Sequence, residues 1–495
     1  MENLNLDKTY IINPKYLLKH DIKRTLIVIR NPYEKSSDVN VDIHSFIHPV
    51  QAMILSFFDG EKDLSRVVED IATFTDLSYD DCLNDIKLYI NNDDFTISFE
   101  KHRIHFPKNF IIEKTNNTFF TYNVDDFLFE ELDFDSFRLF QGPLDITLML
   151  NNNCYTDCIY CYADCNYDVK HYIPYTRIKD LIDESISLGV RNIDLMGGEV
   201  LNHPNWENII EHLIANNYHP YISTKQPLPF EKIKKIKATG LREIQLSIDT
   251  LNPSVAEIML NANHSYVDKI KETIFNFSKI GFQIIINSVV SKYNCTIDNY
   301  KQIFDYLNEF DNIKEFKVTP MGFSLYKTED HFKDIKPSIA NLEVLSQYIE
   351  NESKVLKFEL IMSNFSTNKE YSNSSKITNF NNRNRCTSNQ DQIYILPNGS
   401  VTVCEELMFN ETFIIGNINI ERVKEIWDNN MYSLILQKKM EQNTICSSCE
   451  EFDSCHLNKG VCWKEIMYAY GKDNWHYPDP RCPKSPEPTV EFYLK

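Results

Sequence analysis

The chain has 495 residues, 42% of them hydrophobic and 13% aromatic, which is enough for about three domains with large buried cores. This composition excludes an intrinsically disordered chain and a small scaffold that depends on disulfides. With 71 acidic and 51 basic residues the net charge is −20, so nucleic acid and anionic membrane surfaces are not expected as general partners.

The first 24 residues contain no apolar core of the kind that a signal peptide needs. Apolar runs such as 282–290 are too short to cross a bilayer, so the sequence predicts a cytoplasmic protein with no membrane partner. Cytoplasmic thiols stay reduced, and clustered cysteines there indicate metal ligands or catalytic groups. Cys82 and Cys295 stand alone in the sequence, and we expect each to be a buried small hydrophobe.

Residues 1–110 are predicted to form a small winged-helix-like domain. Residues 25–31 and 95–106 each have the composition of one strand. Between them, apolar side chains at helical spacing indicate three short helices. Ser78 and Asp81 precede the third helix in a pattern that resembles a capping box.

A linker is expected at 111–140, where the sequence is aromatic and acidic and shows no clear period. Residues 141–325 then alternate strands with amphipathic helices. The expected strands are 144–150, 191–196, 219–224, 242–249, 282–290 and 315–321. This alternation predicts an α/β fold, an open or partial (β/α)6 barrel of the TIM type, with ligands at the C-terminal ends of its strands.

The remainder of the chain divides into a bridging region and a cysteine-rich domain. Residues 326–380 form the bridge, with a helix expected near 338–357. Residues 381–495 contain short turns in place of long periodic elements. Such a region lacks a large apolar core, so we expect bound metal to order it.

The first cysteine group opens directly after the first barrel strand, at Cys154, Cys158, Cys161 and Cys165. The spacing C-x3-C-x2-C lets the first three thiolates wrap a cubane iron–sulfur cluster and leaves one iron without a protein ligand. Tetrahedral zinc, with Cys165 as the fourth ligand, is an alternative that the spacing leaves open. The position after a strand, and Tyr160 before the third cysteine, favour the cluster.

At Cys154, Cys158, Tyr160 and Cys161 the sequence resembles the radical SAM superfamily, whose signature is C-x3-C-x-aromatic-C. The resemblance implies that the open iron binds S-adenosylmethionine (SAM) and that one electron from the cluster cleaves it to a 5′-deoxyadenosyl radical. An electron donor such as flavodoxin or ferredoxin is implied as a partner, and Tyr160 is expected beside the bound cofactor. Cys165 is then no ligand, but either a passive loop residue or a hydrogen-atom or proton donor near the radical.

Other positions are similar to SAM-binding positions of that superfamily. Gly197, Gly198 and Glu199 match its G-G-E motif, whose backbone and carboxylate hold the methionine amino group. The resemblance places further SAM contacts at Ser223, Ser247, Asn287 and Val318. Relatives often carry an arginine after the fourth strand to pair with the SAM carboxylate; it is missing here, and Lys225 or backbone groups are its candidate replacements.

The second cysteine group resembles the SPASM extension of radical SAM enzymes that modify peptides and proteins. Its pattern is C-x12-G-x4-C around Gly399, then C-x2-C-x5-C-x6-C and a last cysteine, with a third gap longer than the family's. The resemblance implies two auxiliary clusters, and hence three [4Fe-4S] clusters in all. The distal cluster would be held by Cys446, Cys449, Cys455 and Cys482. The near cluster would be held by Cys386, Cys404 and Cys462.

Three cysteines leave one iron of the near cluster open for a substrate thiolate or an electron, unless another residue or a water fills it. A zinc ribbon built from the same seven cysteines is the alternative metal site.

Residues 47–72 resemble the peptide-recognition domain typified by the pyrroloquinoline-quinone D-type chaperone. That domain binds a leader peptide as an added strand at the edge of its sheet. The resemblance therefore implies a ribosomally made precursor peptide as the substrate. Together, these patterns predict a maturase that installs a thioether or carbon–carbon crosslink in that peptide. The alternatives are a sulfatase-maturing enzyme that forms formylglycine and a non-enzymatic iron–sulfur redox scaffold.

Overall fold

The computed structural model describes residues 4–31, 43–115, 119–163, 168–169, 171–363, 373–429, 433–440 and 444–490. The chain divides into two compact units. The first comprises Met1–Leu144 and Ser185–Asn192, and the second comprises Asp145–Glu184 and Ile193–Lys495. Over the described ranges, no helix has the length and hydropathy needed to cross a bilayer.

The first unit contains two three-stranded sheets and a β-hairpin. One sheet has the order β5-β1-β8, formed by Asp59–Asp63, Thr9–Ile12 and Ile111–Glu113. The other has the order β2-β3-β4, formed by Tyr16–His20, Thr25–Ile29 and Ile43–Ile47. The hairpin pairs β6 (Phe95–Phe99) with β7 (His102–Phe106). Our prediction of a single strand over 95–106 is wrong, because Glu100 has a left-handed φ of 51° and the chain turns back there.

Three helices cover the apolar interior of the first unit, as predicted. They are α1 (Pro49–Leu55), α2 (Leu64–Thr75) and α3 (Tyr79–Ile86). The predicted cap of the third helix is confirmed, since Ser78 Oγ accepts a hydrogen bond of 3.2 Å from the Asp81 amide. Cys82, on α3, is 2% exposed and packs in this core, as expected.

The predicted linker 111–140 contributes to the first unit. Its first residues form β8, which pairs with β1. The short 3-10 helix η1 (Val124–Phe127) follows, and Phe127 is buried in the core of the unit. Much of this segment is therefore part of a packed domain.

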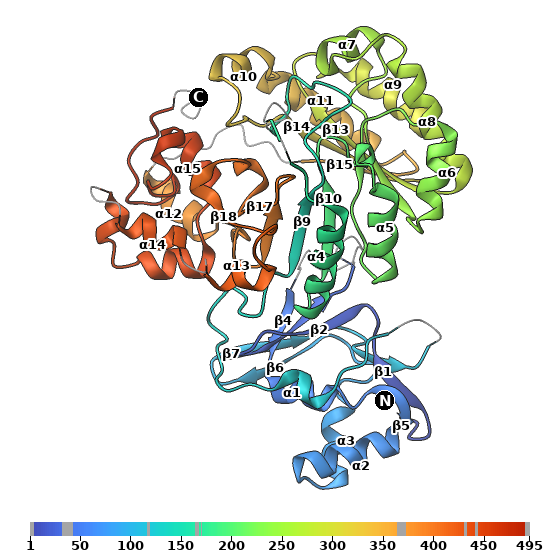
Figure 1. The fold of residues 1–495 in the computed structure, drawn as a ribbon, viewed down its shortest axis with the longest axis vertical. Helices are drawn as coiled ribbons and strands as arrows, with labels where there is room; N and C mark the ends of the chain where they lie inside the picture. Colours follow the sequence, from blue (N-terminus) through green and yellow to red (C-terminus); the bar gives the residue numbers. More distant parts are fainter. Residues whose placement is uncertain are drawn as a thin grey trace. The chain divides into compact units, whose positions relative to one another are not determined.

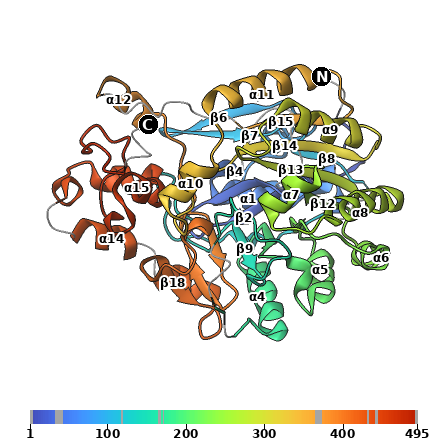
Figure 2. The same cartoon turned by 90° about the horizontal axis from the view of Figure 1, so that it is seen from above.

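The second unit contains the predicted barrel. Its six strands are β9 (Asp145–Met149), β10 (Asn192–Met196), β11 (Ser223–Thr224), β12 (Glu243–Ser247), β13 (Gln283–Val290) and β14 (Ile313–Pro320). The helices between and around them are α4 (Tyr175–Ser187), α5 (Trp206–Ala215), α6 (Phe230–Ala238), α7 (Pro253–Leu260), α8 (Tyr266–Ile280) and α9 (Ile297–Leu307). Strands β11 to β14 pair in parallel, and a parallel bridge joins Leu195 at the end of β10 to Ile222 before β11. All six predicted strands are confirmed, and helices α5, α6, α8 and α9 lie outside the sheet (Figures 1 and 2).

The rest of the second unit extends the barrel sheet at both ends. Strand β15 (Glu359–Met362) adds in parallel to β14, after α10 (Glu329–Ile335) and α11 (Ile339–Glu352). At the other end, β16 (Gln392–Ile395) adds in parallel to β9, and β17 (Ser400–Thr402) and β18 (Ile414–Asn417) follow in antiparallel order. Helices α12 (Asn373–Asn381), α13 (Val423–Asn429), α14 (Ser433–Met440) and α15 (Trp463–Tyr470) complete the C-terminal region, drawn in orange and red in Figure 1.

Candidate functional site

The first cysteine loop leaves β9 at Met149 and is anchored by backbone hydrogen bonds. The amides of Asp157 and Ile159 donate to the carbonyls of Leu260 and Met259 at the end of α7, each at 3.0 Å. The Ile159 carbonyl also contacts His331 Nε2 at 2.7 Å. These bonds fix the loop while its thiols stay accessible: Cys154 is exposed, and Cys158 and Cys161 are half-buried. Cys165 lies outside the described residues.

The G-G-E motif packs directly against this loop. The Gly198 amide donates to the Asn151 carbonyl at 2.8 Å. A Cβ atom at Gly198 would lie 2.2 Å from the Asn153 carbonyl oxygen, and one at Gly197 would lie 2.7 Å from the Asn151 carbonyl oxygen. Both positions therefore require glycine, because the backbone of β10 runs against the backbone that carries the cysteines.

Glu199 is buried and its carboxylate is bound by protein groups. Thr224 Oγ1 donates to one oxygen at 2.7 Å, and the Leu201 amide donates to the other at 3.3 Å. Burial raises the pKa of Glu199 despite these bonds. In this structure Glu199 joins the end of β10 to β11, and its contact with the methionine amino group stays a prediction.

A hydrogen-bonded triad of Tyr160, Lys225 and the buried Asp249 lies beside the cysteine loop. Lys225, directly after β11, forms an ion pair of 2.8 Å with Asp249, which follows β12. The Tyr160 hydroxyl donates to the same carboxylate oxygen of Asp249 and accepts from Lys225 Nζ. Burial opposes charge on Lys225, but the Asp249 carboxylate and the Cys158 thiol outweigh it and raise the pKa of Lys225.

Asp249 is the member of this triad that the sequence did not reveal. Its second carboxylate oxygen accepts from the Val289 amide at 2.8 Å, so β13 holds it in place. The signal available in the sequence was its position, since it follows a barrel strand whose C-terminal end was expected to face the ligand.

The four other predicted SAM contacts lie on neighbouring strands. Ser247 and Asn287 face each other in the register of β12 and β13, and Ser223 on β11 pairs with Gln245. Asn287 Nδ2 donates to the Tyr221 hydroxyl at 3.2 Å, and Ser247 Oγ accepts from Gln245 at 3.1 Å. Val318, on β14, is fully buried. Their contacts with SAM stay predictions.

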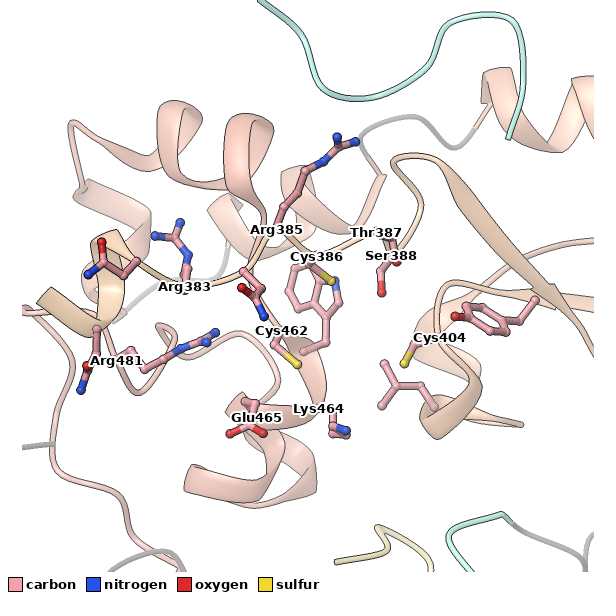
Figure 3. Close-up of a pocket in the computed structure, with 16 residues that line it drawn as sticks. Arg383, Arg385, Cys386, Thr387, Ser388, Cys404, Cys462, Lys464, Glu465 and Arg481 are labelled. Atoms are coloured by element: carbon pink, nitrogen blue, oxygen red, sulfur yellow. The ribbon is translucent and has the colours of Figure 1, made fainter. Parts of the chain in front are cut away.

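Cys386, Cys404 and Cys462 converge on one cavity of about 710 Å³ (Figure 3). They reach it from the turn before β16, the end of β17 and the start of α15. Burial raises the pKa of Cys404 and of Cys462 to about 12, and the nearby Cys386 thiol contributes to both increases. The basic side chains at this cavity are Arg383, Arg385, Lys464 and Arg481.

The other four C-terminal cysteines form a second group. Cys446 lies in the short 3-10 helix η5 (Ile445–Ser448), Cys449 directly follows it, and Cys455 lies in the π-helical turn η6 (Ser454–Lys459). Cys482 interacts electrostatically with each of these three thiols. The assignment of each cysteine group to a cluster stays a prediction.

These donor sets fit iron–sulfur clusters, in which each iron takes one thiolate. Zinc instead requires three or four ligands around a single ion. Within the described part of the chain, no three His, Cys, Asp or Glu side chains are close enough to hold one ion in that way. A [4Fe-4S] cluster held by only three cysteines, as expected for the first and the near group, would keep one iron without a cysteine ligand.

The sequence contains two recognised domains. Residues 148–333 match the Radical SAM superfamily, and residues 386–450 match the SPASM iron–sulfur cluster-binding domain. The chain therefore contains a radical SAM domain followed by an iron–sulfur cluster-binding domain. The radical SAM domain implies SAM and a [4Fe-4S] cluster.

Curated relatives match less than half of the chain. The probable GTP 3′,8-cyclase of Methanococcus maripaludis (strain C5) is 25% identical over 194 residues, 38% of this chain and 63% of that protein. That of Methanococcus aeolicus is 25% identical over 221 residues, 43% of this chain and 72% of that protein. The match to the first relative spans less than two thirds of its length.

Among solved structures, Streptococcus suis SuiB covers 95% of this chain and 99% of its own at 14% identity, with a TM-score of 0.62. Its SAM-bound form matches with a TM-score of 0.60 at 13% identity over the same shares of the two chains. These likenesses show that the fold is shared.

Proposed function

We propose that this chain is a radical SAM maturase that installs a thioether or carbon–carbon crosslink in a ribosomally made precursor peptide. The observation that carries the proposal is the convergence of Cys386, Cys404 and Cys462 on a cavity of about 710 Å³. Three thiolates leave one iron of a cubane open, and a cavity of this size has room beside it for a substrate side chain. SuiB, which shares the fold, has been solved bound to its precursor peptide SuiA, and this supports a peptide partner.

The first cysteine loop would generate the radical. Cys154, Cys158 and Cys161 would hold the cluster that, with SAM bound, supplies a 5′-deoxyadenosyl radical for hydrogen abstraction from the peptide. The backbone of Gly197 and Gly198 keeps that loop in place. Lys225, held by Asp249 beside Cys158, would pair with the SAM carboxylate in place of the missing arginine.

The first unit would bind the leader of the peptide. Its sheet β2-β3-β4 has β2 and β4 as outer strands, and an outer strand is what an added peptide strand requires. A flavodoxin or ferredoxin would supply electrons, and the proposed location is the cytoplasm.

The test is an anaerobic incubation of the full-length, cluster-loaded protein with SAM, dithionite and a short peptide encoded beside its gene. We expect 5′-deoxyadenosine, and a peptide that has lost two hydrogen atoms per crosslink and no longer fragments between the joined residues. Cys158→Ala should abolish both products. Cys404→Ala, which removes a near-cluster ligand, should abolish the crosslink and leave formation of 5′-deoxyadenosine.

Two results would contradict the proposal. A product that reacts with a hydrazide contains an aldehyde and would indicate formylglycine instead. Release of 5′-deoxyadenosine with every tested peptide left at its original mass would rule out peptide crosslinking for those substrates.

A further inference from the structure

A buried lysine for which the described residues supply no hydrogen-bond partner lies on α14, which packs against η5, the turn that contains Cys446. Lys438, on α14, is fully buried, and among the described residues nothing accepts a hydrogen bond from its Nζ. The ring of Trp463 lies 5.0 Å from Nζ. Burying an ammonium without a partner is costly, so such a group needs an anion to offset the cost.

The anions around Lys438 are the cysteines and one carboxylate. Burial lowers the pKa of Lys438, and the charges of Cys446, Asp479, Cys455 and Cys482 oppose that shift. Asp479 is already neutralised, since both of its carboxylate oxygens accept from Arg481, at 2.7 and 2.8 Å. The thiolates are therefore the negative charge that remains to face Lys438.

Arg383 and Lys484 also contact cysteines of this group, and both are less buried than Lys438. Arg383 Nη2 lies 3.4 Å from Cys455 Sγ, and this side chain also donates to the carbonyls of Phe380 and Gly460. Lys484 Nζ lies 3.5 Å from Cys449 Sγ, but its side chain is 51% exposed and is screened by water. His456, also buried nearby, bonds the Phe452 carbonyl through Nδ1. Lys438 is thus the most deeply buried of these cations.

We propose that Lys438 is a charge-compensating residue of the distal cluster: its ammonium faces the thiolates of Cys446, Cys455 and Cys482 and raises the reduction potential of the cluster that these cysteines hold with Cys449. A four-thiolate cluster is an anion and gains one more negative charge on reduction, so a buried positive charge stabilises the reduced form. The inference rests on the proposed distal cluster, and it is independent of which bond the enzyme forms in its peptide.

The test is a reductive titration of the full-length, cluster-loaded protein, followed by electron paramagnetic resonance. In Lys438→Met we expect the equilibrium constant for reduction of one cluster to fall about tenfold. For a one-electron couple this is a shift of about 59 mV to lower reduction potential. The other clusters should keep their potentials, including the one whose signal responds to SAM. Lys438→Arg should restore most of the shift.

A matched control lies next to it on the same helix. Lys439 is 42% exposed and pairs with Asp453 at 2.9 Å, so Lys439→Met should move no potential. Unchanged potentials in Lys438→Met with a full iron load would overturn the inference. If Lys438→Met loses iron, the iron content of Lys438→Arg distinguishes two explanations. Retained iron in Lys438→Arg supports the charge role, and lost iron shows that the effect comes from packing alone.

Failure of the cluster assignment would look different. If Cys446→Ala kept the iron content of the wild-type protein, the distal cluster itself would be refuted before any potential was compared.

Discussion

At Gly198, the absence of a Cβ atom lets the first cysteine loop pack against β10. A methyl group there would meet the carbonyl of Asn153 at 2.2 Å, and a backbone atom cannot move away as a flexible side chain can. We expect Gly198→Ala to lower the free energy of unfolding by about 1–3 kcal/mol and to cost about four iron atoms per chain. Iron analysis and thermal unfolding measure the two effects.

Gly322→Ala is the control for that substitution, because a Cβ at Gly322 would meet nothing within 4 Å. It should leave both iron content and melting temperature close to the wild-type values. Equal iron content in Gly198→Ala and Gly322→Ala would mean that the loop tolerates the displacement.

The role of Lys225 is also testable at the scale of one residue. If its ammonium pairs with the SAM carboxylate, Lys225→Met should weaken SAM binding by about 2 kcal/mol, roughly thirtyfold in Kd, while the iron content is kept. Because this change leaves Asp249 buried without its partner, the double variant Lys225→Met with Asp249→Asn should also be measured.

The single variant Asp249→Asn tests whether Lys225 binds SAM or only forms a structural ion pair. It removes the anion and keeps the ammonium, so SAM binding should fall less than in Lys225→Met. Equal SAM affinity in wild-type protein, Lys225→Met and the double variant would assign the pair to structure alone. Lys235→Met, on the exposed pair with Glu207, controls for loss of a positive charge.

At the scale of elements, the turn between β16 and β17 explains why a glycine stands at position 399. Gly399 has a left-handed φ of 86°, and a Cβ there would lie 2.2 Å from Asn419 Nδ2 and 2.7 Å from Asn417 Oδ1. Strand β17 leads directly to Cys404. A strained turn would therefore displace a ligand of the near cluster.

We expect Gly399→Ala to cost about 1–3 kcal/mol and to lower the iron bound at the near cluster. Gly281→Ala is the matched comparison, since Gly281 also has a left-handed φ, of 77°, but open space around it. It should cost about 1 kcal/mol, the backbone strain alone, with no loss of iron. If Gly399→Ala and Gly281→Ala have the same melting temperature and bind equal iron, the side chains of Asn417 and Asn419 move aside at little energetic cost.

The elements that could be predicted are those with a local signal. Apolar runs such as 282–290 marked the barrel strands, and a serine before a helical stripe marked the start of α3. The hairpin at 95–106 was missed because its turn is Glu100-Lys101, without the glycine or asparagine that usually accompanies a left-handed φ. Asp249 and Lys438 were missed because burial and ion pairing are set by segments distant in the sequence.

At the scale of the whole second unit, the first and the near cysteine groups adjoin strands of the same sheet. Strand β9, which precedes Cys154, pairs in parallel with β16, which follows Cys386, and Leu148 aligns with Ile395. This pairing joins segments almost 250 residues apart through a strand of four residues, so no local pattern could reveal it. It explains why the C-terminal region is part of the same compact unit as the barrel.

Metal removal should nevertheless affect that unit unevenly. Residues 444–490 contain one α-helix of eight residues, α15, and several short turns, whereas 283–290 is a barrel strand flanked by parallel partners. A segment with few regular elements depends on its ligands for order. Chelation of the iron should therefore raise amide hydrogen exchange in 444–490 by about tenfold or more, which would correspond to about 1.4 kcal/mol of local stability.

Protection in β13 and in α2 of the first unit should stay within about twofold of the loaded protein, because their cores contain no cluster ligands. Hydrogen-exchange mass spectrometry of the loaded and chelated protein gives the comparison. A uniform loss of protection across both units would mean that the clusters stabilise the whole chain. Unchanged exchange in 444–490 would mean that aromatic packing around Trp463 and Trp475 keeps this segment ordered without metal.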